Sequence, residues 1–297
     1  MLCETIREKG YAKINLHLDI TGRLDGGYHA VSTVMQTVSL CDELTISNIK
    51  KSDSAIFRLE CNNPDVPCDE RNLAYKAAML FCENAGVNIS ADIRIEKNIP
   101  MAAGMAGGST DGAAVLRGLN KALGEPLSIE QLCEIGSRLG ADIPFCIVGG
   151  TLYADGRGDI LHKLPNMPDC ALLVACEGEG VSTPWAYRLL DTVHSDFNEN
   201  SAYSPKDMNA LNERLKSGEI KKIALEMYNI FEEPVLSERP VANRVKELML
   251  EGGAINAMMS GSGPSVFGIF LSNNDAERAR KLLEDNGFKG YICNPVQ

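Results

Sequence analysis

The stretch Pro100-Met-Ala-Ala-Gly-Met-Ala-Gly-Gly-Ser-Thr-Asp111 decides the fold of this chain. It follows an alternating apolar segment, Ala91 to Glu96, and precedes residues 112–123, whose apolar positions recur at helical spacing. The sequence therefore predicts a strand, a glycine-rich loop and a helix, in this order.

Three glycines give this loop the properties of a phosphate-binding site. Gly104, Gly107 and Gly108 carry no Cβ, so backbone N–H groups can approach a ligand closely where the helix begins. The helix dipole adds partial positive charge, and the hydroxyls of Ser109 and Thr110 can cap the helix or reach a phosphate or its metal. The alternative is that the glycines only permit tight packing of the helix on a sheet.

The loop lacks the two common nucleotide-binding fingerprints. No Gly-Lys-Ser/Thr follows the first glycine at Walker A spacing, and there is no Gly-x-Gly-x-x-Gly. The loop also comes after several predicted strands, and no acidic ribose-binding residue follows it. These differences exclude a Rossmann oxidoreductase.

The composition is that of an ordinary globular protein. The 297 residues are 44% hydrophobic and 23% charged, which predicts one large or two modest domains. We place the boundary near residues 160–168, which gives domains 1–162 and 163–297. No stretch approaches 18 consecutive apolar residues, and Met1 to Gly10 carries charges where a signal peptide needs an apolar core. We therefore expect a cytoplasmic protein.

Charge and cysteine usage narrow the possible partners. The net charge of −11 argues against nucleic acid or a membrane surface as a partner. The ten cysteines are scattered without a Cys-x-x-Cys pair, which indicates reduced thiols rather than zinc ligands or disulfides. The four histidines also lack metal-ligand spacing. A phosphate ligand would then depend on local positive potential.

The first strand carries candidate site residues on its polar face. From Tyr11 to Ile20 apolar residues alternate with polar ones, among them Lys13 and Asn15. For Lys13 an ordinary solvated sheet face explains this pattern better than a site. Tyr28 and His29 follow a glycine turn, where they can anchor the core or recognise a base.

Asp142 is the candidate carboxylate. A Ser-x-x-Gln capping box at Ser128 opens a helix that ends at Gly140, and Asp142 follows before an apolar run. It is either a helix cap or a carboxylate at the wall of a site.

The remaining chain alternates helices and strands. Helices are predicted at about 72–82, 207–217, 218–229, 239–251 and 275–285, and Pro184 marks a further helix start. Short strands are predicted at 31–40, 43–47, 55–60, 171–176, 254–259, 265–271 and up to 293, with a second small-residue loop at 260–264. The pattern is typical of an α+β fold.

Four ordered motifs resemble the superfamily of galactokinase, homoserine kinase, mevalonate kinase and phosphomevalonate kinase (GHMP kinases). They are residues 12–16, the loop from Pro100 to Asp111, residues 140–144 and residues 259–264. Gly27-Tyr28-His29 adds a resemblance to the family within it that phosphorylates the C2 hydroxyl of 4-diphosphocytidyl-2-C-methyl-D-erythritol in non-mevalonate isoprenoid biosynthesis. The resemblance implies two lobes, one like ribosomal protein S5 domain 2 and one ferredoxin-like.

The resemblance also implies roles for individual residues. Asp142 would be the catalytic carboxylate, with Lys13 as its partner. Asn15, Tyr28, His29 and Tyr187 would bind the substrate, the aromatic residues at its cytosine. The residues implied to bind ATP are Asn72, Leu73, Lys97, Pro100, Met101, Ala102, Ala103, Gly104, Met105, Ala106, Gly107, Gly108, Ser109 and Thr110.

The loop departs from the family where Ala102, Ala103 and Ala106 replace glycine. Because alanine disfavours positive φ, we expect positive φ only at Gly104, Gly107 or Gly108. Ile230 also stands where many members have aspartate.

The expected cosubstrate is ATP with Mg²⁺, without a tightly bound cofactor. No carboxylate cluster marks a metal site, and Ser109 or Thr110 could contact the ion. The partners would be small molecules only, and the protein a monomer or homodimer. Two alternatives stay open: another kinase of the superfamily, acting on homoserine, mevalonate or a sugar, and a non-catalytic nucleotide sensor on this fold.

Overall fold

The computed structural model describes residues 4–194, 197 and 203–297. The chain forms two compact units, each assembled from separate segments. Unit 1 contains the chain up to Ala12 together with residues 41–99 and 106–148, and unit 2 contains residues 13–40, 100–105 and 149–297. The linear division at residues 162 and 163 stays a prediction. Most of the irregular segment 194–205, and Cys3, lie outside the described residues.

Two long strands contribute residues to both units: β1 (Thr5–Arg23) and β2 (His29–Lys51). Each is longer than the sequence pattern predicted, and β2 joins two strands that were expected to be separate. The alternation of the first strand is confirmed, but its polar residues Lys13, Asn15, His17 and Asp19 are all buried. A solvated sheet face is therefore the wrong interpretation of this strand, because both of its faces are covered.

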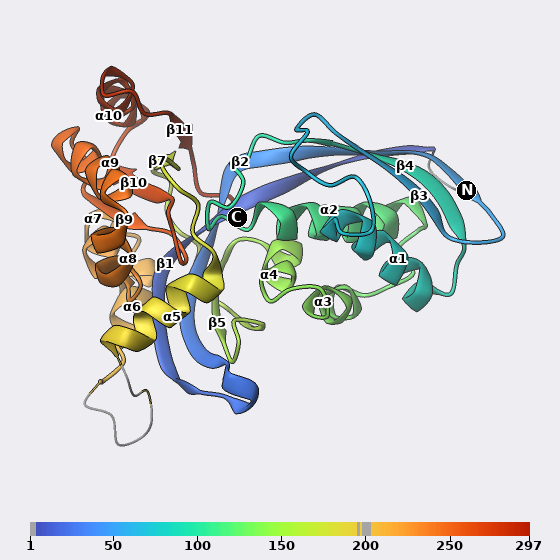
Figure 1. Ribbon diagram of the computed structural model, residues 1–297, viewed down its shortest axis with the longest axis horizontal. Coiled ribbons are helices and arrows are strands. Elements are labelled where there is room, and N and C mark those ends of the chain that lie inside the picture. The colour runs from blue at the N-terminus through green and yellow to red at the C-terminus, as the bar shows by residue number, and fades with distance from the viewer. Residues whose placement is uncertain (1–3, 195–196, 198–202) are drawn as a thin grey trace. The chain divides into compact units, whose positions relative to one another are not determined.

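Unit 1 is a sheet covered by helices. Its own strands are β3 (Ile56–Cys61) and β4 (Ile89–Glu96), and β4 pairs antiparallel with β2 and parallel with β3. Its helices are α1 (Leu73–Ala85), α2 (Gly107–Ala122), α3 (Ile129–Ser137) and α4 (Asp142–Val148). Figure 1 shows α1 and α2 side by side along the strands. The predicted strand, loop and helix are confirmed here.

Close packing of α2 on the sheet depends on a glycine. A Cβ at Gly118 would lie 2.8 Å from Cδ1 of Ile46 on β2, a distance that real Cβ atoms do not tolerate. Tight helix–sheet packing therefore does explain one glycine of α2. At Gly107, the first residue of the helix, an added Cβ would meet Lys97 Nζ at 3.2 Å and Ile99 Cγ2 at 3.3 Å, so this glycine also permits close packing, against the segment that follows β4.

Unit 2 holds a four-stranded sheet in the order β11-β7-β10-β9. These strands span Gly290–Cys293, Ala171–Ala175, Val266–Phe270 and Asn256–Met259, and all neighbours are antiparallel. β5 (Thr151–Asp155) pairs with β2 and with β6 (Ile160–Lys163), and β8 (Tyr228–Asn229) pairs with β1. The helices of this unit are α5 (Thr183–Val193), α6 (Asn209–Ser217), α7 (Ile220–Glu226), α8 (Glu232–Glu238), α9 (Pro240–Glu251) and α10 (Asn273–Asp285).

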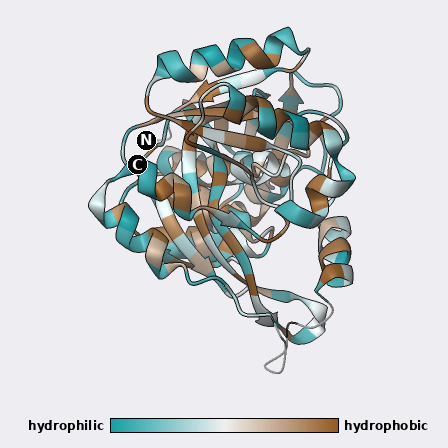
Figure 2. Cartoon of the chain, turned by 90° about the vertical axis from the view of Figure 1, so that its left-hand side faces the viewer, coloured by the Kyte–Doolittle hydropathy of each residue, from teal (hydrophilic) through white to brown (hydrophobic). Residues whose placement is uncertain are grey.

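The helices of unit 2 are amphipathic. In α10 the buried residues are Ala276, Ala279 and Leu283, spaced three and four apart. Hydrophobic and hydrophilic positions alternate along the helices of this unit (Figure 2). Gly252 at the end of α9 lets α10 approach, because a Cβ there would lie 2.6 Å from Cβ of Ala279. The apolar stripes of the two helices join the core of the four-stranded sheet.

The predicted capping box and the proline at a helix start are confirmed, whereas the predicted end of one helix is wrong. The capping box joins Ser128 and Gln131 reciprocally, and Pro184 lies in the first turn of α5. The helix predicted at 218–229 ends at Glu226, and the residues after it form β8. Tyr228 and Asn229 do not continue the helix because they pair as a strand with β1, and this pairing decides their conformation.

No described helix is both long and apolar enough to cross a membrane. The nine cysteines within the described residues form no disulfide.

Candidate active site

The start of α2 offers backbone donors within unit 1. The N–H of Thr110 binds the carbonyl of Ala106, which makes it the first N–H of the helical ladder. The N–H groups of Gly107, Gly108 and Ser109 precede it, so the helix itself supplies them no acceptor. No side chain caps this end. Three aligned donors at a positive dipole end are suited to an anion.

The loop conformation corrects one prediction. Positive φ occurs at Gly104 (72°), as expected, but also at Ala102 (52°) and Ala106 (59°), whereas Gly107 and Gly108 are helical. Our expectation that only glycines adopt positive φ here was therefore wrong. For alanine this conformation costs about 1–2 kcal/mol, which the surrounding packing must offset. Ala106 is the residue that directly precedes α2.

Two residues assigned to the nucleotide pocket lie beside this helix start. Leu73 contacts the glycine region, since a Cβ at Gly108 would lie 3.6 Å from Leu73 Cδ1. Asn72 caps α1: its side-chain oxygen accepts the N–H of Ala74 at 2.8 Å, and its amide donates to the carbonyl of Pro67 at 2.8 Å. The structure thus brings Asn72, Leu73 and the second half of the loop together in unit 1.

Lys97 also lies at this helix start, but its ammonium group is engaged by protein. It donates to Asp42 Oδ2 and, at 2.8 Å, to Asp111 Oδ2, and its side chain is 5% exposed. Asp42 additionally accepts the N–H groups of Asn98 and Ile99. The Lys97 side chain, one residue after β4, therefore binds to Asp111 in the second turn of α2.

The acidic members of this cluster, Asp42 and Asp111, were not among the residues predicted from the sequence. Burial, followed by the influence of the Asp42 carboxylate, raises the pKa of Asp111 against the opposing effect of Lys97. One Asp111 oxygen, Oδ1, is buried without a hydrogen bond. Burial alone would lower the pKa of Lys97, but the two carboxylates raise the pKa above its ordinary value. Lys97 could be singled out from the sequence because it lies next to the predicted end of a strand. Its partners Asp42 and Asp111, 55 and 14 residues away in the chain, carried no recognisable signal.

The two hydroxyls of the loop differ in availability. Thr110 is fully buried and donates its hydroxyl to the carbonyl of Tyr11 at 2.8 Å. Ser109 is half-buried, and a Cβ at Gly140 would lie 4.0 Å from its Oγ. Of the two, Ser109 is the hydroxyl accessible to a ligand at the helix start. Its neighbour Gly140 belongs to the turn that leads to Asp142.

Asp142 is the first residue of α4 and is half-buried. Its carboxylate accepts no backbone N–H among the described residues of unit 1, so it does not act as a hydrogen-bonding cap. The apolar run after it forms the buried part of α4. Of the two interpretations left open by the sequence, the uncommitted carboxylate is favoured.

In unit 2, Lys13 heads a chain of hydrogen bonds. Its ammonium donates to Asn15 Oδ1 at 2.7 Å, Asn15 Nδ2 donates to Thr33 Oγ1 at 2.8 Å, and Thr33 donates to the carbonyl of His17 at 2.7 Å. Lys13 and Asn15 are 5% and 3% exposed. The chain fixes the position of the Lys13 ammonium. It also links Lys13 to Asn15, for which the resemblance implied different roles.

The second small-residue loop lies against Lys13. A Cβ at Gly261 would lie 3.4 Å from Lys13 Nζ and 3.1 Å from the carbonyl of Gly104. Asn229 holds this loop by donating to the carbonyls of Met259 and Gly261 at 2.8 and 2.9 Å. The side chain of Ile230 is buried in the core of unit 2. Unit 2 thus combines Lys13, Asn15, residues 100–105 and residues 260–264.

The aromatic residues of the predicted substrate site also lie in unit 2. His29 is buried, with its ring 4.8 Å from that of Tyr187 and 5.7 Å from that of Phe197. Tyr28 is 57% exposed, with the Arg157 guanidinium 5.4 Å from its ring centre. Gly26 and Gly27 precede it with φ of 78° and 81°, so the turn that presents Tyr28 requires glycine.

The ion pair beside His29, formed by Asp191 and Arg23, had no signal in the sequence. His29 Nε2 lies 2.8 Å from Asp191 Oδ1, and Arg23 donates to the same oxygen at 2.8 Å. Tyr187 and Asp191 are one turn apart on α5, so one face of that helix contacts His29 twice.

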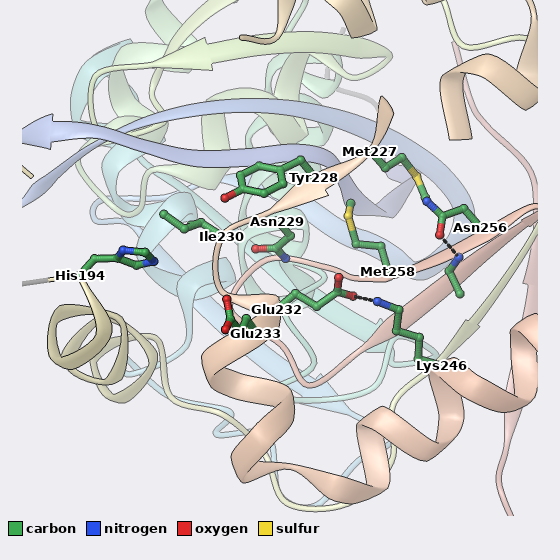
Figure 3. A pocket seen from close by; sticks show the side chains of 11 residues that line it. His194, Met227, Tyr228, Asn229, Ile230, Glu232, Glu233, Lys246, Asn256 and Met258 are labelled. Carbon is green, nitrogen blue, oxygen red and sulfur yellow. Dashed lines mark hydrogen bonds and ion pairs between the residues drawn. The ribbon is translucent and has the colours of Figure 1, made fainter. Parts of the chain in front are cut away.

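A separate cavity of about 280 Å³ in unit 2 was not predicted. Figure 3 shows it between β8, β9, α8 and α9, with Glu232 paired to Lys246 at 2.8 Å. It is lined by His194, Met227, Tyr228, Asn229, Ile230, Glu232, Glu233, Lys246, Asn256, Ala257 and Met258. None of the residues predicted to act on substrate or ATP lines it, and we assign it no role.

The described part of the chain contains no group of three or more His, Cys, Asp or Glu residues placed to hold a metal ion.

The predicted site residues divide between the units. Unit 1 holds Asp142, Asn72, Leu73, Lys97 and residues 106–110; unit 2 holds Lys13, Asn15, Tyr28, His29, Tyr187 and residues 100–105. Within unit 1 the arrangement offers an anion site beside an apolar side chain and a free carboxylate. Within unit 2 it offers a fixed ammonium group and an aromatic cluster.

Family models and solved structures agree on the class of this fold. The GHMP kinases N terminal domain matches residues 72–150, and the GHMP kinases C terminal model matches residues 210–288. Homoserine kinase from Cytophaga hutchinsonii shares the fold with a TM-score of 0.72 at 18% identity, covering 100% of this chain and 96% of that one. The chain is thus a small-molecule kinase of the GHMP class, which confirms the predicted α+β fold.

More similar proteins define the family within that class. The 4-diphosphocytidyl-2-C-methyl-D-erythritol kinase of Caldicellulosiruptor saccharolyticus is 43% identical over 93% of this chain and 92% of its own length. The protein of that name from Exiguobacterium sibiricum is 41% identical over 98% and 96%. A crystal structure of 4-(cytidine 5'-diphospho)-2C-methyl-D-erythritol kinase aligns with a TM-score of 0.80 and 29% identity, covering 98% of this chain and all of that one. The chain belongs to the 4-diphosphocytidyl-2-C-methyl-D-erythritol kinase family.

Proposed function

We propose that this protein transfers the γ-phosphoryl group of ATP to the C2 hydroxyl of 4-diphosphocytidyl-2-C-methyl-D-erythritol, a step of non-mevalonate isoprenoid biosynthesis. The observation that carries the proposal is the likeness to kinases of that name over 93–98% of the chain. The hydroxyl oxygen forms a bond to the γ-phosphorus, the bond to the ADP oxygen breaks, and the hydroxyl proton leaves to a base.

We assign that base to Asp142. Its carboxylate is the uncommitted one at the start of α4, near the Ser109 end of the glycine loop. Lys13 supplies a positive charge whose position is fixed by Asn15. The roles suit the residue types, because a carboxylate accepts a proton and an ammonium stabilises negative charge on the transferred group.

The glycine loop binds the phosphates of ATP in this proposal. Three N–H groups at the start of α2 face the anion, and Leu73 offers an apolar surface beside them for the adenine. Lys97 contributes by holding the helix start rather than by binding the nucleotide with its engaged ammonium. Phosphoryl transfer depends mainly on such positioning and charge stabilisation.

Magnesium would arrive with ATP. When bound, it neutralises charge on the β- and γ-phosphates. Ser109 is the accessible hydroxyl that could contact it, which fits an ion held mainly by phosphate oxygens and water.

The test measures, in a coupled assay, the release of ADP by the purified protein in the presence of Mg-ATP. The acceptors are 4-diphosphocytidyl-2-C-methyl-D-erythritol and, in parallel, homoserine, mevalonate and galactose. We expect turnover with the first alone. Turnover with another acceptor would support the assignment as a kinase but contradict the proposed cytidine-containing substrate. ATP binding without any turnover would favour a nucleotide sensor.

A further inference from the structure

Asn229 connects the strand that carries Lys13 with the loop 260–264. It belongs to β8, which pairs parallel with β1 so that Asn229 lies opposite Leu18, and the N–H of Ile230 donates to the carbonyl of Leu18 at 3.0 Å. Asn229 is therefore held at a fixed place along β1, the strand that also bears Lys13. At 4% exposure it is closed off from solvent.

The side-chain amide of Asn229 is fully engaged by backbone groups. Its Nδ2 donates to the carbonyls of Met259 and Gly261 at 2.8 and 2.9 Å, and its Oδ1 accepts the N–H of Phe231 at 3.0 Å. Carbonyls only accept and an N–H only donates, so these partners settle which way the amide points. Met259 and Gly261 flank Ser260 in the chain. One side chain thus fixes the turn at which β9 passes into the loop.

This loop packs against the Lys13 ammonium. A Cβ at Gly261 would lie 3.4 Å from Lys13 Nζ and 3.5 Å from Asn15 Oδ1, the oxygen to which that ammonium donates. Ser260 is fully buried, and its Oγ lies 3.5 Å from the same Asn15 oxygen. The backbone of the loop therefore borders the Lys13–Asn15 pair, and a displacement of the loop changes the surroundings of the ammonium.

The partner of the Gly261 carbonyl determines what Lys13 can bind. An ammonium group carries three donors, and among the described residues of unit 2 Lys13 Nζ has one acceptor, Asn15 Oδ1. The remaining donors are the ones that the proposed reaction uses for negative charge. Gly261 is buried, and a buried carbonyl without a partner is costly, so a released carbonyl would compete for these donors. Asn229 occupies that carbonyl instead.

We propose that Asn229 is a positioning residue for Lys13: it holds the loop 260–264 beside the ammonium and keeps the Gly261 carbonyl engaged, so that Lys13 retains donors for the transferred phosphoryl group. The inference rests on the proposed function, in which Lys13 stabilises the charge on that group. Because Lys13 acts on the transition state, loss of the Asn229 donors should lower kcat and leave the KM of ATP nearly unchanged.

The experiment measures kcat and both KM values of the full-length protein by coupled ADP release with Mg-ATP and 4-diphosphocytidyl-2-C-methyl-D-erythritol. Asn229→Asp keeps the size of the side chain and the acceptor for Phe231, but a carboxylate cannot donate to the carbonyls of Met259 and Gly261. We expect kcat to fall about ten- to a hundredfold, as for a small displacement of a catalytic group, with the KM of ATP within about twofold of the wild type.

Asn256 offers a matched control in the same unit. Its side-chain amide also binds backbone groups: Nδ2 donates to the carbonyl of Ala224 at 2.7 Å, and Oδ1 accepts the N–H of Ala257 at 2.9 Å. These two hydrogen bonds end outside the loop 260–264. Asn256→Asp therefore makes the same chemical change without releasing the Gly261 carbonyl, and its kcat should equal that of the wild type.

A double-mutant cycle separates positioning from a merely structural role. Lys13→Met removes the ammonium and keeps most of the aliphatic stem, so it lowers kcat on its own. Adding Asn229→Asp to Lys13→Met should lower kcat by less than about threefold further, because the group that Asn229 positions is already absent. A structural role unrelated to Lys13 would give the full additional loss.

Two results would overturn the inference: a folded Asn229→Asp protein with wild-type kcat, or full additivity of its loss with that of Lys13→Met. If Asn229→Asp does not fold, Asn229→Ser, which keeps a hydroxyl donor, replaces it in both measurements and should show a smaller loss that also disappears in the Lys13→Met background. Wild-type turnover of 4-diphosphocytidyl-2-C-methyl-D-erythritol with unaffected Asn229 variants would refute this inference alone. Absence of that turnover in the wild type would refute the proposed function instead.

Discussion

At the scale of single residues, the molecule buries polar groups on its first strand and makes different use of each. The Lys13 ammonium donates a hydrogen bond to Asn15, whereas the Nε2 atom of His17 is buried without a hydrogen bond. Asp142 keeps its carboxylate free of backbone donors within unit 1. Unsatisfied or uncommitted groups of this kind are where chemistry or pH sensitivity is expected.

Asp142→Asn should remove most turnover while leaving ATP binding intact. The amide keeps the size of the side chain but cannot accept the substrate proton, and loss of a general base typically costs 10²–10⁴-fold in rate. Steady-state kcat and calorimetric titration with ATP measure the two effects. Glu130→Gln, the same change at an exposed acid in the first turn of α3, is the control. An Asp142→Asn enzyme with wild-type kcat would exclude Asp142 as the base.

His17 should make the protein less stable in mild acid. Burial, with a smaller effect of Lys206, lowers the pKa of His17 to about 4 from 6.5. The unfolded chain then binds more protons than the folded one between these values, so the free energy of unfolding falls as pH falls. From pH 7 to pH 5 this amounts to about 2 kcal/mol. Urea unfolding of wild type and His17→Phe at both pH values measures it, and the variant should lack this part of the pH dependence. Parallel pH profiles would contradict the assignment.

At the scale of elements, the glycine loop combines a favourable helix start with local strain. Gly104 occupies positive φ without cost, but Ala102 and Ala106 occupy it against their preference. Around the same helix start, the Lys97 ammonium joins α2 to β4 through two carboxylates. The loop is therefore held in place by long-range contacts rather than by its own conformational preference.

Ala106→Gly and Ala102→Gly should each stabilise the protein. Glycine removes a strain of about 1–2 kcal/mol and adds about 0.5–1 kcal/mol of unfolded-chain entropy, which leaves a net gain of up to about 1 kcal/mol. The midpoint of thermal unfolding should rise by about 2 °C. Ala103, buried and outside the positive-φ positions, is the control, and Ala103→Gly should destabilise. A lower midpoint for Ala106→Gly would show that its methyl group packs more favourably than its backbone is strained.

Asp42→Asn should destabilise the protein more than Asp111→Asn. Asp42 accepts from Lys97 and from two backbone N–H groups, and breaking such a buried pair costs about 3–5 kcal/mol. Asp111 has one unsatisfied oxygen and a raised pKa, so its charge is already disfavoured there. Denaturant unfolding at pH 8 compares the variants. Equal losses would mean that the two carboxylates are equivalent partners of Lys97.

At the scale of the whole molecule, both units contain cysteine thiols whose reactivity is suppressed by burial. Burial raises the pKa of Cys133 to about 11 and those of Cys170 and Cys293 to about 12. Cys68 is the one described cysteine that is exposed. No disulfide joins the cysteines of the described residues.

In a Cys3→Ser background, a disulfide reagent should modify Cys68 quickly and the remaining thiols only on unfolding. Thiolate is the reactive species, and burial suppresses it at the other positions. Absorbance at pH 8 follows the reaction, and Cys68→Ser should abolish the fast phase. Fast reaction of several thiols in that variant would indicate local opening of a unit.

The sequence by itself determined the α+β pattern, the glycine loop, the capping box at Ser128 and the family to which the chain belongs. These depend on residues close together in the chain, whose periodicity and turn chemistry act locally. Tertiary structure alone decided the partners of Lys97, the positive φ of Ala106 and the contact between His29 and Asp191, 162 residues apart. Such contacts arise from packing between segments distant in the chain, and packing can impose an unfavourable backbone conformation that no local preference predicts.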